Sequence, residues 1–253
     1  MSQGKRKARH WVGTSGWTYR NWKPGFYPRG LQQGDWLSHY AEHLASVELN
    51  ASFYRPPARK MLDGWAKKTP PGFLFAIKGW RLITHMKRLK DAGEDAEGFL
   101  ERLEPLGDKL GPVLFQLPPN FDYDRERLKD FLTALPGKGP HGRWRFAMEF
   151  RDKSWQRDEV YRLLSDHNIA WVPFELARQR GPRLATADFV YVRLHGRKAK
   201  YRGNYAKRTL QDWAEWLSEQ MDEGRDAHVY FDNTDEADHA VRNAMTLDDL
   251  LRG

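Results

Sequence analysis

The 253-residue chain contains no cysteine. This absence excludes disulfides, thiolate nucleophiles and cysteine-ligated zinc or iron–sulfur centres. The sequence also lacks an apolar run of the roughly 18 residues that a membrane-spanning helix needs, and its first residues lack the apolar core of a signal peptide. We therefore expect a soluble, cytoplasmic protein.

Aromatic residues and positive charge are abundant. The chain has 11 Trp, 10 Tyr and 13 Phe residues, enough large side chains for a sizeable core despite a mean hydropathy of −0.81. Of the net charge of +8, half comes from Lys5, Arg6, Lys7 and Arg9. We expect residues 1–10 to form a disordered basic tail and residues 11–253 to form one domain, because no linker divides the rest of the chain.

Eight segments have the pattern of buried strands, and seven of them are followed by helical patterns. The expected strands are 11–17, 46–50, 73–78, 111–119, 145–151, 169–173, 189–195 and 228–233. The expected helices cover about 35–44, 59–68, 95–106, 124–135, 157–167, 209–223 and 235–251. This alternation predicts an α/β fold, a single (β/α)8 TIM barrel with a weak or missing helix after strand six. An open doubly wound sheet is disfavoured, because residues 13–16 do not match its phosphate-binding glycine motif.

Polar side chains gather near the carboxyl ends of the predicted strands. In strand five, Phe146, Met148 and Phe150 share one face, while Glu149 and Arg151 lie on the other. In a parallel barrel the carboxyl ends of all strands surround one mouth, where barrel enzymes have their active sites. The residues expected at this mouth are Ser15, Glu48, Asn50, Lys78, Gln116, Glu149, Arg151, Arg193, His195 and Asp232.

Seven sequence blocks resemble the DUF72 family. They are Ser15-Gly16-Trp17, Glu48-Leu49-Asn50-Ala51-Ser52-Phe53-Tyr54, Thr84-His85, 114–119, Glu149-Phe150-Arg151 with Ser154-Trp155, Arg193-Leu194-His195-Gly196, and 240–244. The resemblance spans nearly the whole chain and implies a TIM barrel, but it implies no particular reaction. One block departs from the family pattern, because Phe231-Asp232-Asn233 stands where Phe-Asn-Asn is usual, which adds a carboxylate at Asp232.

The leading hypothesis is a hydrolase- or lyase-like enzyme for a small anionic or phosphate-bearing substrate. Cationic side chains would bind the anion, while carboxylates and histidines would transfer protons. The candidate catalytic residues are Glu48, Glu149, His195 and His85. The candidate substrate-binding residues are Ser15, Trp17, Asn50, Tyr54, Lys78, Gln116, Arg151, Arg193, Asp232 and Asn233. Aromatic residues are expected to wall the pocket, namely Trp17, Tyr19, Trp22, Phe53 and Tyr54. His85 has an alternative interpretation, as a packed imidazole beside a helix N-cap at Thr84.

Four other interpretations stay open. The mouth charges could form a purely structural ion-pair lattice. Glu48, Glu149, His195 and Asp232 could instead ligate Mg, Mn or Zn in an isomerase- or endonuclease-like site. Lys78 could form a Schiff base. Finally, the basic tail and the basic loop 196–208, with Tyr201 and Tyr205, could bind nucleic acid. A serine hydrolase is disfavoured, because Ser15 lies in no G-x-S-x-G motif. The oligomeric state is not predicted.

Overall fold

A computed structural model describes residues 7–139, 142–197 and 199–253. Its main sheet contains ten strands in the order β10-β9-β11-β12-β1-β2-β3-β4-β7-β8, and all pairings except β9 with β10 are parallel. The strands are β1 His10–Ser15, β2 Ser46–Leu49, β3 Leu74–Lys78, β4 Leu110–Leu117, β7 Phe146–Phe150, β8 Ala170–Trp171, β9 Phe174–Leu176, β10 Gln179–Arg180, β11 Phe189–Leu194 and β12 Asp226–Phe231. A separate small hairpin joins β5 Lys138–Gly139 to β6 Gly142–Arg143.

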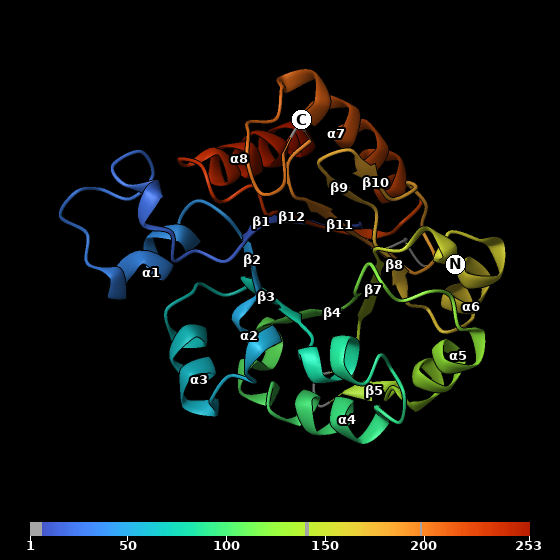
Figure 1. Ribbon diagram of the computed structural model, residues 1–253. Coiled ribbons are helices and arrows are strands. Elements are labelled where there is room, and N and C mark those ends of the chain that lie inside the picture. Colours follow the sequence, from blue (N-terminus) through green and yellow to red (C-terminus); the bar gives the residue numbers. More distant parts are fainter. Residues whose placement is uncertain (1–6, 140–141, 198) are drawn as a thin grey trace, which may run out of the picture.

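The sixth predicted strand, 169–173, and the residues just after it join the two ends of the parallel sheet. Strand β8 lies within the predicted range and pairs with β7, whereas β9 lies just beyond that range and pairs with β11. Between them, the carbonyl oxygen of Pro173 accepts a hydrogen bond from the backbone N–H of Arg193. The chain then turns back through β10 instead of forming a helix. The curled sheet of Figure 1 is thus a TIM-barrel fold, and the predicted lack of a helix after strand six is confirmed.

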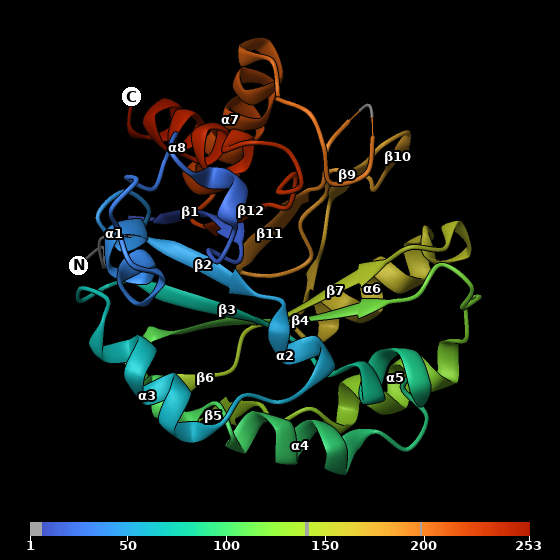
Figure 2. The same cartoon turned by 60° about the vertical axis from the view of Figure 1, so that its left-hand side comes forward.

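The described residues form eight α-helices, and most of them lie around the outside of the sheet (Figures 1 and 2). They are α1 Trp36–Ala41, α2 Ala51–Tyr54, α3 Arg59–Lys67, α4 Gly93–Glu101, α5 Arg125–Ala134, α6 Asp158–Asp166, α7 Lys207–Asp222 and α8 His239–Arg252. None of them is long and apolar enough to cross a membrane.

The apolar core has two parts, as the alternating strand pattern predicts. The larger part lies between sheet and helices and includes Val47, Phe75 and Met148. The smaller part contains side chains of the opposite parity, such as Ala76 and Tyr191. The second set lies inside the barrel, because successive strand residues point to opposite faces. This parity brings the polar residues at the strand ends into the interior as well.

Three local features differ from the sequence predictions. Strand β1 begins at His10, inside the segment expected to be disordered, and the backbone N–H of Arg9 donates to Asp226 Oδ1. Residues 1–6 of that expected tail lie outside the described residues. The short helix α2 was not predicted, and neither was a π-helix at Leu82–Met86. Thr84 lies within this π-helix, so the predicted N-cap role of Thr84 is wrong.

Candidate active site at the barrel mouth

A buried arginine connects two buried glutamates at the carboxyl ends of three strands. Arg193, at the end of β11, donates from Nε and Nη2 to the two oxygens of Glu48 at 2.8 and 2.7 Å. Its Nη1 donates to Glu149 Oε2 at 2.8 Å. Both glutamates are fully buried, and Arg193 is 1% exposed. This fork geometry suits a guanidinium between two carboxylates, and a second guanidinium, that of Arg151, pairs with Glu149 and balances the remaining negative charge.

Neutral donors complete the coordination of Glu48. The hydroxyl groups of Ser15 and Tyr191 each donate to one Glu48 oxygen at 2.6 Å. Burial raises the pKa of the Tyr191 hydroxyl well above its usual value, and the Glu48 charge adds to that effect, so Tyr191 remains a donor. With both oxygens engaged by four hydrogen bonds, Glu48 primarily holds Arg193 in place.

Glu149 stays ionised although it is buried. Burial acts to raise the pKa of Glu149, but the adjacent Arg151 and Arg193 outweigh it and lower this pKa to about 2. Arg151 forms an ion pair with Glu149 through its Nε atom. A carboxylate held by two arginines is a poor proton acceptor at neutral pH, so the geometry favours a charge-holding role for Glu149.

A hydrogen-bonded chain leads from Arg151 to Asp232 through His195. Arg151 Nη2 lies 2.9 Å from His195 Nε2, and His195 Nδ1 lies 2.8 Å from Asp232 Oδ2. Because a guanidinium can only donate, Nε2 accepts and Nδ1 carries the proton that it donates to Asp232. Burial and the nearby Arg193 lower the pKa of His195 well below its usual value. His195 is therefore a neutral imidazole of defined tautomer.

Among the three carboxylates described at the mouth, Asp232 is the one best suited to exchange a proton. Burial raises its pKa to about 6, although Arg193 and Lys78 oppose that rise. Its Oδ1 has no hydrogen bond to a described residue, and its side chain retains 11% exposure. A group with this pKa exchanges its proton near neutral pH, which is what acid–base catalysis needs.

Lys78 and His85 lie together beside the ring of Phe53. The Lys78 ammonium is 4.4 Å from the centre of this ring, and the His85 ring is edge-on to it at 4.8 Å. Burial, followed by the Arg193 charge, lowers the pKa of Lys78 to about 8. Burial, followed by Lys78, lowers the pKa of His85 to about 4. Lys78 forms no ion pair with any described carboxylate, and its amine is therefore available to an incoming anion.

The structure brings most of the predicted residues to the mouth. Asn50 Oδ1 is 3.5 Å from Arg193 Nη2. Gln116 is 9% exposed at the end of β4 and donates to the Leu117 carbonyl. Two residues that were not predicted also lie here: Tyr191, which donates to Glu48, and Phe174, which lies under Arg151. Tyr201, predicted only as a nucleic-acid contact of the basic loop, lies edge-on to His195 at 5.8 Å. Tyr191 could have been predicted, because it shares the parity of Arg193, whereas Phe174 lies beyond the predicted strand end.

Other candidate residues lie elsewhere or have structural partners. Trp17 packs edge-on against Trp65 in the core outside the barrel, and Trp22 is fully buried beside Tyr27. Asn233 is also fully buried. Its Nδ2 donates to the carbonyl of Gly203 and to the side chain of Asn243, which ties a loop to α8. Tyr54, by contrast, is 70% exposed on α2.

The mouth carboxylates do not form a metal-ligand set. Arg193 lies between Glu48 and Glu149 and occupies the lone pairs that a cation would need. Both nitrogens of His195 are engaged as well. The donor arrangement therefore does not fit a divalent ion coordinated by these residues together with Asp232.

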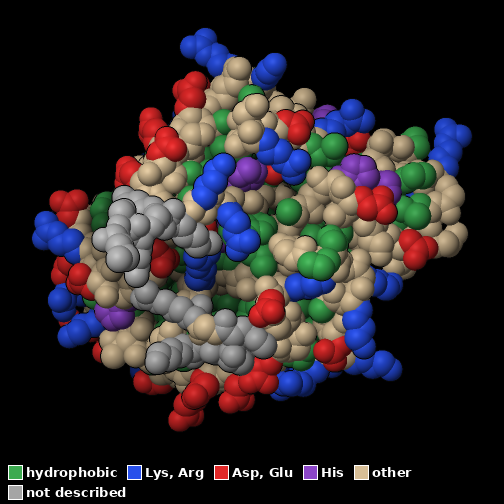
Figure 3. All heavy atoms as spheres, turned by 180° about the vertical axis from the view of Figure 1, so that it is seen from behind, with side chains coloured by type: hydrophobic (Ala, Val, Ile, Leu, Met, Phe, Trp, Pro, Cys, Tyr) green, Lys and Arg blue, Asp and Glu red, His purple; other side chains and the backbone are tan. Residues whose placement is uncertain are grey.

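The basic loop 196–208 is partly tied to the fold. Arg197 pairs with Glu175 at 3.5 Å and donates to the Thr209 hydroxyl at 2.7 Å. Tyr205 is 4% exposed, and its hydroxyl accepts a hydrogen bond from the N–H of Gly196, so this ring is not available for stacking on a base. Residue 198 and tail residues 1–6 lie outside the described residues. On the face opposite to that of Figure 1, basic and acidic side chains are interspersed (Figure 3).

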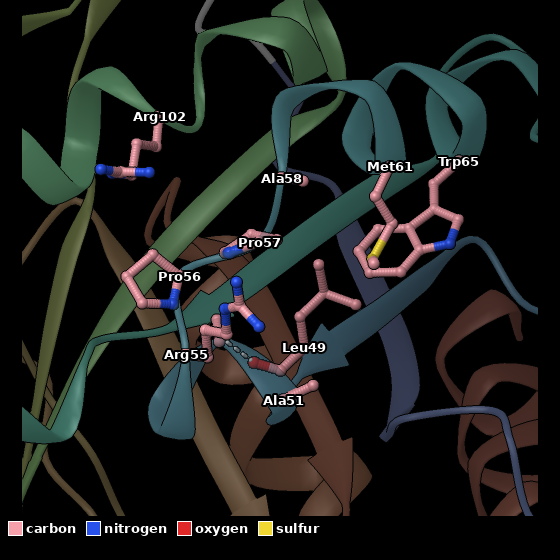
Figure 4. A pocket seen from close by; sticks show the side chains of 10 residues that line it. Leu49, Ala51, Arg55, Pro56, Pro57, Ala58, Met61, Trp65 and Arg102 are labelled. Carbon is pink, nitrogen blue, oxygen red and sulfur yellow. Dashed lines mark hydrogen bonds between the residues drawn. The ribbon is translucent and has the colours of Figure 1, made fainter.

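A cavity of about 470 Å³ lies on the face of β2 that points away from the barrel interior (Figure 4). It is mostly apolar and carries two arginines, and its lining residues are Leu49, Ala51, Ser52, Arg55, Pro56, Pro57, Ala58, Met61, Trp65 and Arg102. Leu49 has the opposite parity to Glu48, so this cavity opens on the helix layer and not into the barrel. It contains no carboxylate or imidazole for proton transfer.

Comparisons with known proteins agree with this architecture. The family model DUF72, a protein family of unknown function, matches residues 11–253. The UPF0759 protein YunF of Bacillus subtilis (strain 168) is 27% identical over 270 residues, covering 94% of this chain and 93% of YunF. The structure of SacUVDE, 7% identical, covers 97% of this chain and 98% of its own with a TM-score of 0.58, which shows a shared fold alone.

A solved structure of a DUF72 family protein is similar to this chain in both sequence and fold. The crystal structure of a DUF72 family protein from Thermotoga maritima MSB8 is 30% identical, with a TM-score of 0.85 over 97% of this chain and 100% of that chain. The family model and this structure cover the strand ends that build the mouth as well as the helices around them. The chain is a member of the DUF72 family.

Proposed function

We propose that the barrel mouth is the active site of a hydrolase- or lyase-like enzyme that acts on a small anionic substrate. The observation that carries this proposal is that some charged groups at the mouth are paired with one another while others are not. Glu48 and Glu149 are balanced by Arg193 and Arg151, whereas the Lys78 amine forms no ion pair and Asp232 Oδ1 no hydrogen bond with the described residues. A purely structural lattice would leave neither group unpaired.

Lys78 would bind the anion together with Arg151. The Lys78 amine lies at the end of β3 and forms no ion pair with a described carboxylate, and the Arg151 guanidinium lies over the Phe174 ring, 4.6 Å from its centre. Glu149 and His195 contact two of the Arg151 nitrogens, while Nη1 donates to no described residue. Electrostatic pairing in a partly buried site is stronger than in water, so two such cations can hold a phosphate or carboxylate group.

Asp232 would transfer the proton. Its Oδ2 accepts a hydrogen bond from His195, which fixes the carboxylate, and Lys78 and Tyr201 are close enough to interact with it electrostatically. The neutral His195 orients Asp232 and is not itself free to accept a proton while Arg151 occupies Nε2. This assigns the acid–base role to Asp232 and positioning roles to Glu48, Glu149 and His195.

The test combines ligand binding with turnover. A panel of phosphate monoesters and small carboxylates is screened for thermal stabilisation of the wild type, and stabilising compounds are assayed for conversion. Lys78→Met should abolish the stabilisation, while Lys129→Met, at an exposed lysine on α5, should leave it unchanged. Asp232→Asn should keep binding but lose turnover, and the wild-type rate should vary with an apparent pKa near 6.

Two outcomes would contradict the proposal. If no anion in the panel stabilises the wild type more than Lys78→Met, the mouth is not an anion site of this kind. If Asp232→Asn turns over a bound compound at the wild-type rate and with the same pH profile, the proton passes through another group.

A further inference from the structure

Three side chains with metal-binding atoms come together at the end of α1, outside the barrel. His39, Glu42 and His43 are three and four residues apart, a spacing that places side chains on one face of a helical turn. One ligand atom from each lies within 4.8 Å of the others, and no other group of three in the described parts of the chain meets this condition. We propose that these residues form a binding site for a divalent transition metal ion of the zinc type.

The hydrogen bonds of the two imidazoles leave one ring nitrogen of each histidine as a possible metal ligand. His39 Nε2 lies 3.1 Å from the carbonyl oxygen of Phe26, and His43 Nδ1 lies 2.9 Å from the carbonyl oxygen of His39. A carbonyl oxygen only accepts, so each of these ring nitrogens carries the proton. The lone pairs are then on His39 Nδ1 and His43 Nε2. Metal-binding histidines use this arrangement, with one nitrogen donating to a backbone carbonyl and the other facing the ion.

The spacing of the ligand atoms is close to what an ion requires. His39 Nδ1 is 3.8 Å from Glu42 Oε2. Around a tetrahedral zinc with bonds of about 2.0–2.1 Å, neighbouring ligand atoms are roughly 3.4 Å apart. The Glu42 side chain is 70% exposed and free to rotate, whereas the His39 side chain is only 19% exposed and already fixed. A small rotation of the Glu42 side chain toward the fixed His39 imidazole would therefore bring these two ligand atoms to the separation that an ion requires.

The ligand set selects among metal ions. Two imidazoles with one carboxylate suit zinc, nickel or copper, while Mg²⁺ and Ca²⁺ prefer oxygen ligands alone. Three protein ligands leave a further position for water or an outside ligand. The ring of Phe26 lies 5.1 and 5.2 Å from the two imidazoles and shields one side of the group.

A bound ion would fix the ring of His39, which holds the long loop before α1 through its hydrogen bond to Phe26. The carbonyl of Phe26 is held by His39, and the same loop reaches the barrel mouth, where Asn21 donates to the carbonyl of Thr234. Because an ion that binds only the folded chain raises its stability, zinc should increase the melting temperature. The site is separate from Lys78 and Asp232, so this inference stands or fails independently of the proposed function.

The experiment uses tag-free, chelator-treated full-length protein. Zinc chloride is titrated calorimetrically, and Co²⁺ is added in parallel to read the ligand field from its visible absorption. The variants are His43→Gln and Glu42→Gln. His167→Gln is the matched control, since His167 Nδ1 also contacts the carbonyl four residues earlier, at 2.9 Å, but belongs to no such group.

We expect one zinc ion per wild-type chain, at least tenfold weaker binding by His43→Gln, and wild-type binding by His167→Gln. Magnesium chloride should not compete. Absence of zinc binding by the wild type, or equal affinity of wild type and His43→Gln, would overturn the assignment. Loss of binding by His167→Gln to the same extent as by His43→Gln would overturn it as well, because zinc would then bind elsewhere.

Discussion

Replacing Arg193 by methionine should strongly destabilise the fold. The substitution keeps most of the side-chain volume but removes three charge-assisted hydrogen bonds of 2.7–2.8 Å to Glu48 and Glu149. Both carboxylates are fully buried, so the loss leaves uncompensated charge where water does not reach. Removing one member of a buried ion pair typically costs about 3–5 kcal/mol.

The remaining contacts keep the cost within that range. Glu48 retains the hydroxyl groups of Ser15 and Tyr191, and Glu149 retains Arg151. For a protein of this length, each kcal/mol corresponds to about 2–4 °C in melting temperature, so the expected decrease is roughly 6–20 °C. The free energy of unfolding is measured by urea titration and the melting temperature by calorimetry.

The pH dependence of the deficit tests the electrostatic cause. In the wild type the pKa of Glu149 is about 2, below its usual value of 4.5, so its stabilisation is present above pH 4.5 and is lost as the pH falls toward 2. Without Arg193 this pKa should rise, and protonation of Glu149 then relieves the buried charge. The deficit of Arg193→Met should therefore be smaller at pH 4 than at pH 7.5.

A surface arginine provides the control. Arg252 is 64% exposed and pairs with Asp248 at 2.6 Å, so Arg252→Met should change stability by about 0.5 kcal/mol or less. A loss below about 1 kcal/mol in Arg193→Met, or a larger loss that is the same at both pH values, would refute the reasoning.

Three further substitutions test other buried groups. Glu149→Gln should weaken the fall in stability between pH 4.5 and 2, because the depressed pKa of Glu149 is one source of that fall, as acid denaturation curves would show. Asp232→Asn should raise the melting temperature more at pH 8 than at pH 4. Burial raises the pKa of Asp232 from 3.8 to about 6, so the ionised form of this side chain destabilises the fold as the pH rises from 3.8 to 6 and above. An equal change in melting temperature at both pH values would contradict this prediction. His228→Phe should not destabilise the fold at pH 7 and should stabilise it near pH 4. His228 is fully buried against Trp11, and neither of its ring nitrogens has a hydrogen-bond partner among the described residues. Burial lowers the pKa of His228 to about 3, so the stability of the wild type falls as the pH drops below 6.5. A loss above about 2 kcal/mol at pH 7 would indicate a hidden polar partner.

The barrel could be predicted because its strands carry a strong local pattern. In β7, Phe146, Met148 and Phe150 alternate with Ala147 and Glu149, and the structure buries the two sets on opposite faces of the sheet. Period-two alternation is set by strand geometry alone, so it needs no tertiary information. The strands and helices could be located to within a few residues because both kinds of element have a local period, of two residues in strands and about 3.6 in helices.

Short and irregular elements were missed because distant contacts stabilise them. Helix α2 has only four residues, and the hydroxyl of Ser52 anchors it by donating to the carbonyl of Lys78 on another strand. The β9–β10 turn depends on pairing of β9 with β11. Forming the first turn of a helix costs more conformational free energy than its hydrogen bonds return, so the local sequence gives no signal for a helix as short as α2.

The candidate site shows the same limit at the level of single atoms. Parity was enough to predict that Glu48, Arg193 and Asp232 share the barrel mouth. It gave no means of deciding which of the two carboxylates pairs with Arg193, because Arg193 Nη2 lies 2.7 Å from Glu48 Oε1 and 3.7 Å from Asp232 Oδ2, a difference that only the folded chain defines. Glu48 and Asp232 look alike in the sequence, yet one accepts four hydrogen bonds and the other keeps an oxygen free. Since a carboxylate can exchange protons with a substrate only through an unengaged oxygen, we base the proposed proton-transfer role of Asp232 on the count of hydrogen bonds, which only the folded structure provides.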